Sequence, residues 1–121
     1  LKCQGDVSNC IFVGNSIKDL DTRDVFYDYF LGGTLNVFSN ANVVNCMFVN
    51  NSAHNGGAIL ISGQDGVISG CTFIGNVGLS KGGAIYALET HQMSIVGCTL
   101  TGNSAINSGG AIAIEGICVN T

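Results

Sequence analysis

Proline and tryptophan are both absent from the 121 residues, and charged side chains make up only 10% of the chain. Soluble domains ordinarily carry about 25% charged residues. Intrinsic disorder requires a low hydrophobic content together with a high net charge. Because 46% of this chain is hydrophobic, the composition excludes a disordered protein and indicates a folded one.

Basic residues and long apolar runs are also scarce. Four Lys and Arg residues face eight Asp and Glu residues, so the net charge is −4. Without a basic stripe to neutralise phosphates, we do not expect nucleic acid as a partner. No stretch approaches the roughly 18 consecutive apolar residues that a spanning helix needs, so we expect no membrane span.

What the sequence does contain is a repeated pair of phrases. The first reads Cys-x-Phe-x, then Gly or Asn, then Asn, and the second reads Gly-Gly-Ala-Ile. Four copies can be aligned on the asparagines Asn15, Asn51, Asn76 and Asn103, on the cysteines Cys10, Cys46, Cys71 and Cys98, and on Phe12, Phe48 and Phe73, which Leu100 replaces in the last copy. A fixed period of this size is typical of solenoid proteins.

Each copy contains three short strand-like pieces that end at Gly or Asn, two residue types that tolerate a positive φ. Period-two alternation places the Cys and Phe of a copy on one face. We therefore predict left-handed bends on both sides of the Cys-x-Phe piece, at Asn9, Asn45, Gly70 and Gly97 before it and at Gly14, Asn50, Gly75 and Gly102 after it.

These features predict an all-β protein, a right-handed parallel β-helix of about four coils. Stacked coils would form columns of Cys, of Phe and of Asn, and each Asn amide can donate to one neighbour and accept from another. We expect residues 1–121 to form one β-helix segment and to be a fragment of a longer solenoid.

The two phrases resemble the repeat of the chlamydial polymorphic outer membrane proteins, which is marked by GGAI and FxxN. GGAI stands at 56–59, 82–85 and 109–112, with GGTL at 32–35, and FxxN stands at 12–15, 48–51 and 73–76. The resemblance implies a right-handed β-helix that is extracellular or at the cell surface. In that family the repeat forms the passenger of an autotransporter and serves in adhesion, but this chain has no recognisable translocator.

One segment, 17–31, interrupts the repeat within the first copy, and insertions in a solenoid form loops that often bind ligands. Its candidate ligand-binding residues are Asp19, Asp21, Asp24, Tyr27, Asp28 and Tyr29. The tyrosines suit sugar rings, the carboxylates suit Ca²⁺, and a solvated loop that covers the coil is the third interpretation. We expect no other cofactor and no metal site.

The four column cysteines are interpreted as buried free thiols, although the spacing of stacked coils permits disulfides. Counting from the column cysteines aligns Cys3 with Ser39, and Cys118 falls at the same coil position at the other end of the stack. These two are candidates for disulfides with coils outside the chain. Asn50 begins the sequon Asn50-Asn51-Ser52 and is a candidate glycosylation site.

For function, we predict a non-catalytic structural or adhesive segment of a cell-surface protein or filament that stacks end to end. Its partners would be copies of itself or neighbouring coils, with glycans or a host-cell surface as further candidates. The alternative is a carbohydrate-binding or polysaccharide-cleaving β-helix that acts through 17–31. For cleavage, the sequence aligns Glu89 and Glu115 at one coil position as a possible carboxylate pair.

Overall fold

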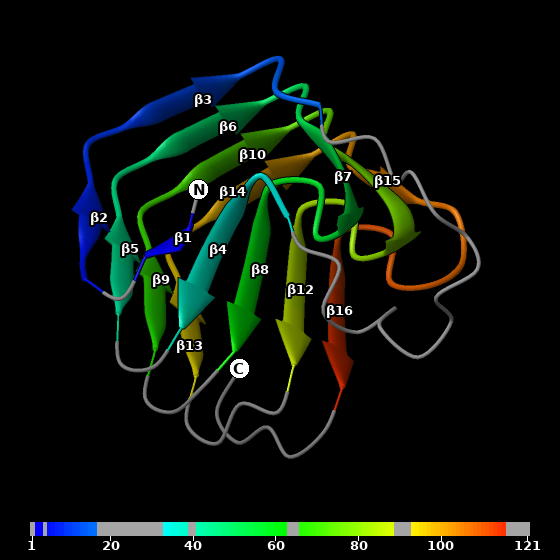
Figure 1. Cartoon of the computed structure of the whole chain (residues 1–121). Helices are drawn as coiled ribbons and strands as arrows, with labels where there is room; N and C mark the ends of the chain where they lie inside the picture. The colour runs from blue at the N-terminus through cyan, green and yellow to red at the C-terminus, as the bar shows by residue number, and fades with distance from the viewer. Residues whose placement is uncertain are drawn as a thin grey trace.

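The computed structural model of the chain describes residues 2–3, 5–16, 33–38, 41–62, 66–88 and 93–115. All of its named elements are β-strands, and every strand pairing is parallel. The coils stack in chain order, from the blue strands β2 and β3 to the orange and red strands of the last coil (Figure 1). The predicted right-handed parallel β-helix is thus confirmed.

The described strands form four sheets, which we name A to D. Sheet A contains β1 (Lys2–Cys3), β4 (Leu35–Phe38), β8 (Ile59–Ser62), β12 (Ile85–Leu88) and β16 (Ile112–Glu115). Sheet B contains β2 (Val7–Ser8), β5 (Asn42–Val44), β9 (Val67–Ser69) and β13 (Ser94–Val96). Sheet C contains β3 (Ile11–Val13), β6 (Met47–Val49), β10 (Thr72–Ile74) and β14 (Thr99–Thr101). Sheet D contains β7 (Ser52–Asn55), β11 (Val77–Lys81) and β15 (Ser104–Ala105).

Equivalent residues of successive copies lie directly over one another in the stack. In sheet C, Phe48 pairs with Phe12 on one side and with Phe73 on the other. In sheet A, Ile59 pairs with Leu35 and with Ile85. Parallel strands pair about 4.8 Å apart, so each repeat of the sequence adds one layer to the stack.

Sheet D is the element that the sequence prediction lacked, because three strands per coil were expected and a full coil has four. Its strands read SAHN, VGLSK and SA. The buried positions carry small or polar residues, namely Ala53 and Asn55 in β7 and Gly78 and Ser80 in β11. A strand with such residues on its buried face lacks the apolar alternation by which strands are normally predicted.

Glycine and asparagine hold the corners of the coil, as predicted. The bends that flank sheet C have φ between 54° and 65° at Asn9, Asn45, Asn50, Gly14, Gly70, Gly75, Gly97 and Gly102. In the Gly-Gly pairs, the first glycine also has a positive φ, 71° at Gly56. The second glycine allows close approach between layers, since a Cβ on Gly83 would lie 2.1 Å from the carbonyl oxygen of Gly110.

The core is the inside of the coil. Its fully buried side chains include Phe48, Phe73, Ile59, Ile85 and Ile68, which belong to sheets C, A and B. A second, smaller cluster, Leu60, Tyr86, Leu88 and Ala113, lies on strands of sheet A. Tyr86 and Leu60 alternate with the inward-facing isoleucines, so this cluster is on the outer face of sheet A.

Candidate functional site

The motif asparagines form a continuous ladder of hydrogen bonds through the coils. The backbone N–H and the side-chain Nδ2 of Asn51 both donate to Oδ1 of Asn76, each at 3.0 Å. Asn15 donates to Asn51 in the same way at 3.0 Å, and Asn76 donates to Asn103 at 2.9 Å. Every step therefore runs in one direction, from each coil to the following one.

The amides of Asn51, Asn76 and Asn103 also bond to the sheet C strand of the preceding coil. The Nδ2 atom of Asn76 donates to the carbonyl of Phe48 at 3.0 Å, and that of Asn103 donates to the carbonyl of Phe73 at 3.0 Å. Asn51 and Asn76 are fully buried. Because a buried polar group without a partner costs about 1–3 kcal/mol, these asparagines are best understood as structural parts of the fold.

The phenylalanine column stacks face to face. Ring centroids are 4.8 Å apart between Phe12 and Phe48 and 5.0 Å apart between Phe48 and Phe73, and the planes are tilted by 3° and 4°. Leu100 continues the column in the last coil. An in-register parallel sheet imposes this arrangement, since the rings share one rotamer and one layer spacing.

The column cysteines Cys10, Cys46, Cys71 and Cys98 are free thiols. Cys46 and Cys71 are buried, and each Sγ lies within hydrogen-bonding distance of backbone carbonyls, Val44 for Cys46 and Ser69 for Cys71, at 3.4 and 3.3 Å. Burial raises the pKa of the Cys71 thiol to about 11 and also raises the pKa of Cys46. A protonated, buried thiol is a weak nucleophile, so these two residues act as small core groups.

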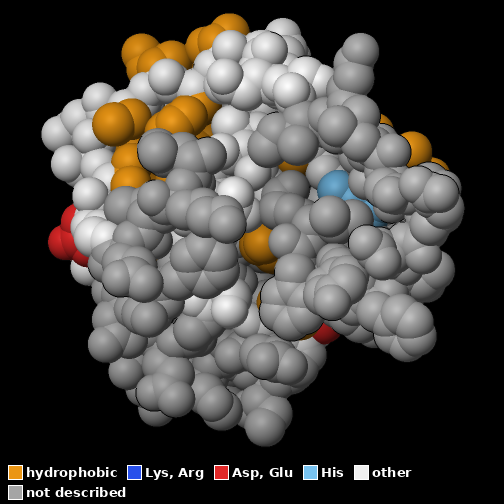
Figure 2. Space-filling model, in the orientation of Figure 1, with side chains coloured by type: hydrophobic (Ala, Val, Ile, Leu, Met, Phe, Trp, Pro, Cys, Tyr) orange, Lys and Arg blue, Asp and Glu red, His pale blue; other side chains and the backbone are white. Residues whose placement is uncertain are grey.

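The outer face of sheet C carries no charge; it is aliphatic in β3 and β6 and at Ile74, and threonines line the rest of it in β10 and β14. Its outward residues are Ile11, Val13, Met47, Val49, Thr72, Ile74, Thr99 and Thr101. Ile11 and Val13 are 70% and 60% exposed, and Met47 and Ile74 are each 40% exposed. Hydrophobic side chains gather at the upper left of the space-filling view, in the region of β2 and β3 (Figure 2). We call this surface the sheet C face.

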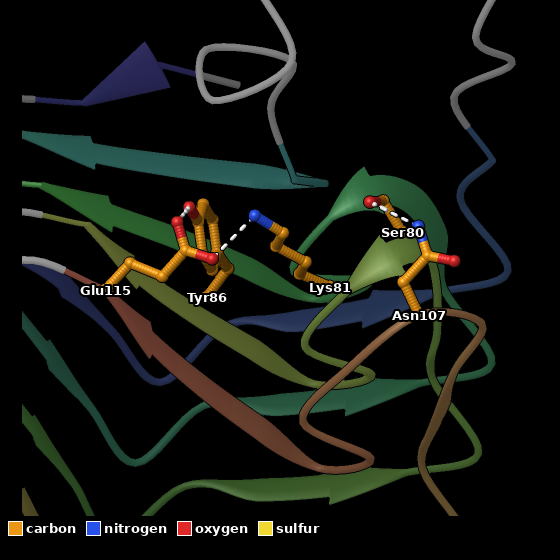
Figure 3. Close-up of polar contacts among 5 residues, drawn as sticks. All are labelled: Ser80, Lys81, Tyr86, Asn107 and Glu115. Carbon is orange, nitrogen blue, oxygen red and sulfur yellow. Dashed lines mark hydrogen bonds and ion pairs between the residues drawn. The ribbon is translucent and has the colours of Figure 1, made fainter.

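A polar cluster lies beside the outer face of sheet A (Figure 3). Lys81 forms an ion pair with Oε1 of Glu115 at 2.5 Å, and the Tyr86 hydroxyl donates to Oε2 of Glu115 at 2.8 Å. Lys81 Nζ lies 6.0 Å from the centroid of the Tyr86 ring. Nearby, Nδ2 of Asn107 donates to Oγ of Ser80 at 3.1 Å. Sequence reasoning missed this cluster because Lys81 belongs to the unexpected sheet D and Tyr86 looked like an ordinary outward residue.

The proposed alignment of Glu89 with Glu115 is wrong, because strand pairing sets Leu88 beside Glu115. Glu115 is instead neutralised by Lys81. Within the described ranges, no group of three or more His, Cys, Asp or Glu side chains is arranged to hold a metal ion. In this part of the chain, Glu115 is the ion-pair partner of Lys81 and the hydrogen-bond acceptor of Tyr86.

Other candidates from the sequence lie partly outside the described residues. This applies to Asp19, Asp21, Asp24, Tyr27, Asp28 and Tyr29 of the 17–31 segment, and to Cys118. Cys3 pairs with Val37, two residues before the predicted Ser39, so it shares its coil position with Ile114. Asn50 sits in an exposed bend with φ of 55°, and Asn51, the next residue of the sequon, is buried.

Together, the directional ladder, the stacked rings and the glycine corners define a parallel β-helix built from sequence repeats. Comparison with protein families identifies these repeats: the family model of the Chlamydia polymorphic membrane protein repeat matches residues 45–62, 70–88 and 97–115. The chain thus carries three consecutive repeats of this family, and the resemblance noted from GGAI and FxxN is confirmed. Repeats of this family indicate a surface-exposed segment of an outer membrane protein.

Searches of curated proteins and of solved structures gave no significant match. Within the described ranges, no helix has the length and hydrophobicity needed to cross a membrane.

Proposed function

We propose that this chain is a non-catalytic structural and adhesive segment of a cell-surface protein. The β-helix is its rigid support, and the sheet C face is its contact surface. Its partners are other coils of the same kind and a host-cell surface or the glycans on it.

One observation carries the proposal, namely the exposure of Ile11 and Val13 at 70% and 60% on a face without charge. Exposed apolar groups that lie together on a flat sheet commonly mark interaction surfaces. Met47 and Ile74 extend this surface across two more coils. The residues that repeat most strictly point inward and stabilise the stacking of the coils. Residues at the outward positions are therefore the ones available for binding.

Measurement of cell binding tests the adhesive role. The 121-residue chain would be fluorescently labelled and titrated onto cultured epithelial cells. We expect the triple variant Ile11→Ser, Val13→Ser, Ile74→Ser to lose at least about tenfold in affinity, because it removes three of the five aliphatic or Met side chains of the sheet C face. The matched control is Val96→Ser with Ile106→Ser, at residues that are 57% and 70% exposed outside this face.

Unchanged binding by the triple variant, or equal losses in the triple variant and the control, would overturn the assignment of the sheet C face. The absence of binding by the unaltered chain would overturn the adhesive role itself. A glycan array run in parallel covers the alternative, since loss of glycan binding in a Tyr27→Ala, Tyr29→Ala variant would transfer recognition to the 17–31 segment.

A further inference from the structure

The sulfur atoms of the cysteine column keep one orientation from coil to coil. The Cys71 Sγ lies 3.5 Å from the carbonyl oxygen of Val43 in the preceding coil and 3.3 Å from that of Ser69 in its own coil. Equivalent pairs of contacts recur at Cys46 with Val7 and Val44, and at Cys98 with Ile68 and Val96. Cysteines that make equivalent contacts share one rotamer, so neighbouring sulfurs lie one layer apart, about 4.8 Å.

Cys46 and Cys71 are the two members of the column that lie inside the core. The N–H of Thr72 donates to the carbonyl of Cys46 at 2.9 Å, and the N–H of Cys46 donates to the Cys71 sulfur at 3.5 Å. Both side chains are buried, with 2% and 1% of their surface exposed, and both are free thiols. The core therefore holds two reduced sulfurs in adjacent layers, away from water.

The spacing of these two sulfurs fits a metal ion with two ligands in a line. Cysteine sulfur selects soft metal ions. A zinc–thiolate bond is about 2.3 Å long, so two collinear bonds of that length span about 4.6 Å, close to one layer of the stack. An ion that requires more ligands has no such set here, because the described ranges hold no suitable group of three or more His, Cys, Asp or Glu side chains.

The surroundings of the two sulfurs favour a divalent ion over a monovalent one. Backbone carbonyl oxygens, which carry partial negative charge, surround both sulfur atoms. Burial raises the pKa of both thiols, because the core disfavours a thiolate charge. A divalent ion that replaces both thiol protons leaves a neutral product, whereas a monovalent ion such as Ag⁺ leaves one negative charge in the core.

We propose that Cys46 and Cys71 form a binding site for a soft divalent cation that takes two sulfur ligands in a line, and that the mercuric ion, Hg²⁺, has this chemistry. Each thiol releases its proton to solvent and forms one bond to the ion, and no oxidation state changes. This site goes beyond the structural and adhesive role. Sequence reasoning predicted no metal site because no Cys-x-x-Cys spacing occurs, and it is the register between coils that brings these two sulfurs together.

Two variants with equal numbers of thiols test the site. The adjacent-pair variant retains Cys46 and Cys71 and carries Cys3→Ser, Cys10→Ala, Cys98→Ala and Cys118→Ser. The spaced-pair variant retains Cys10 and Cys71, which lie two layers apart, and carries Cys3→Ser, Cys46→Ala, Cys98→Ala and Cys118→Ser. Each would be titrated with mercuric chloride while the released protons are counted, and then dialysed against a competing monothiol.

We expect the adjacent-pair variant to bind one mercuric ion per chain and to release two protons for it. It should retain the ion at least about a hundredfold more tightly than the spaced-pair variant does, because its second sulfur is already in place. X-ray absorption should show two sulfur neighbours at about 2.3 Å. Equal retention by the two variants, one ion per thiol in the adjacent-pair variant, or a different set of ligands would overturn the proposal.

Thermal unfolding tells whether the ion binds the folded chain. A ligand of the folded state raises the midpoint of unfolding, so we expect a higher midpoint for the adjacent-pair variant with one equivalent of mercuric chloride. A lower midpoint would show that the ion binds the unfolded chain, and would overturn the site. Far-UV circular dichroism without the ion verifies the fold of both variants.

Should either variant fail to fold, the unaltered chain decides the question. With ¹³C-labelled cysteine Cβ atoms, one equivalent of mercuric chloride should shift the NMR signals of Cys46 and Cys71 and leave those of Cys10 and Cys98 in place. Shifts at another pair, or at all the cysteines equally, would overturn the assignment. Cell binding through the sheet C face does not involve these thiols, so the adhesive role and the metal site can fail independently.

Discussion

The two faces of sheet C share the same strands and differ in what constrains them. On the inner face, Phe12, Phe48 and Phe73 recur unchanged and stack at 4.8 and 5.0 Å. On the outer face, the column that starts at Ile11 continues through Met47 to Thr72 and Thr99. An inward residue must fit the layers above and below it, whereas an outward residue has no such requirement. The residues that repeat are therefore the ones that the fold requires. The outward positions, which vary between copies, can change without disturbing the stack and are available for binding.

The largest expected effect comes from Gly83→Ala, which places a methyl group inside the stack. The added Cβ would lie 2.1 Å from the Gly110 carbonyl oxygen and 2.5 Å from the Ser104 backbone nitrogen, and neither backbone atom can rotate away. We expect a loss of about 4 kcal/mol or more in the free energy of unfolding, measured by urea denaturation.

Gly110→Ala is the matched control, because Gly110 holds the same position in the last coil and a Cβ there meets nothing within 4 Å. Its effect should be within about 0.5 kcal/mol. Equal losses at the two glycines would contradict the requirement for close approach between layers.

The next effect distinguishes an inner rung of the Asn ladder from an end rung. Asn76→Ala removes the acceptor of two hydrogen bonds from Asn51 and the donor to the Phe48 carbonyl, all of them buried. We expect a loss of about 3 kcal/mol on urea denaturation.

Asn15→Ala removes the end rung, which is exposed and donates to Asn51 with its Nδ2 atom. Its loss should be about 1 kcal/mol. A cost at Asn15 equal to that at Asn76 would show that burial in the ladder is not what makes these asparagines necessary.

The thiol column makes stability depend on alkaline pH. Cys71 has a pKa of about 11 in the folded protein, raised by burial, against an ordinary value of 9.0. Between about pH 9 and 11 the unfolded chain releases a proton that the native state keeps, so stability is complete below this range and falls as the pH rises through it. We expect a loss of up to about 2 kcal/mol by pH 10.5 that is absent from a Cys46→Ala, Cys71→Ala variant.

The difference in the free energy of unfolding between the unaltered chain and the Cys46→Ala, Cys71→Ala variant separates the contribution of the thiols from that of other groups that titrate in this range. Urea denaturation at pH 7, 9 and 10.5 measures it. A difference that stays constant across the three values would show that the column thiols do not contribute through ionisation.

The smallest expected effect comes from placing Phe at the one position of the inner column of sheet C where the last copy has Leu. Leu100→Phe would extend the stacked rings beyond Phe73 into the last coil. Because an aromatic pair adds about 0.5–1.5 kcal/mol beyond its buried area, we expect a gain of about 0.5 kcal/mol in the free energy of unfolding. Thr99→Phe, on the outer face of the same strand, should give no gain, and a gain from Thr99→Phe equal to that from Leu100→Phe would contradict the role of stacking.

The sequence predicts much of the architecture because the repeat exposes the register directly. The bends at Asn45 and Gly70, with φ of 54° and 61°, follow from the two residue types that accept this conformation. The pairing of Phe48 with Phe73 follows from their identical places in successive copies. Because the copies repeat strictly, residues that pair between distant strands can be predicted from their positions in the local motif.

The remainder escaped because it lacks a hydrophobic pattern or joins residues that share no motif. Sheet D has inward Ala53 and Gly78, which give no hydrophobic signal. The ion pair of Lys81 with Glu115 joins two positions 34 residues apart that share no motif. The sheet C face was missed for a related reason, since single outward aliphatic residues look ordinary until the register places Ile11, Met47 and Ile74 on one surface.

Nuclear Overhauser contacts among assigned phenylalanine ring protons test most directly whether equivalent residues lie one layer apart. The structure predicts strong contacts from Phe48 to both Phe12 and Phe73, at centroid distances of 4.8 and 5.0 Å, and none between Phe12 and Phe73. An absence of contacts between Phe48 and Phe73, or a direct contact between Phe12 and Phe73, would contradict the stacking of the coils in this order.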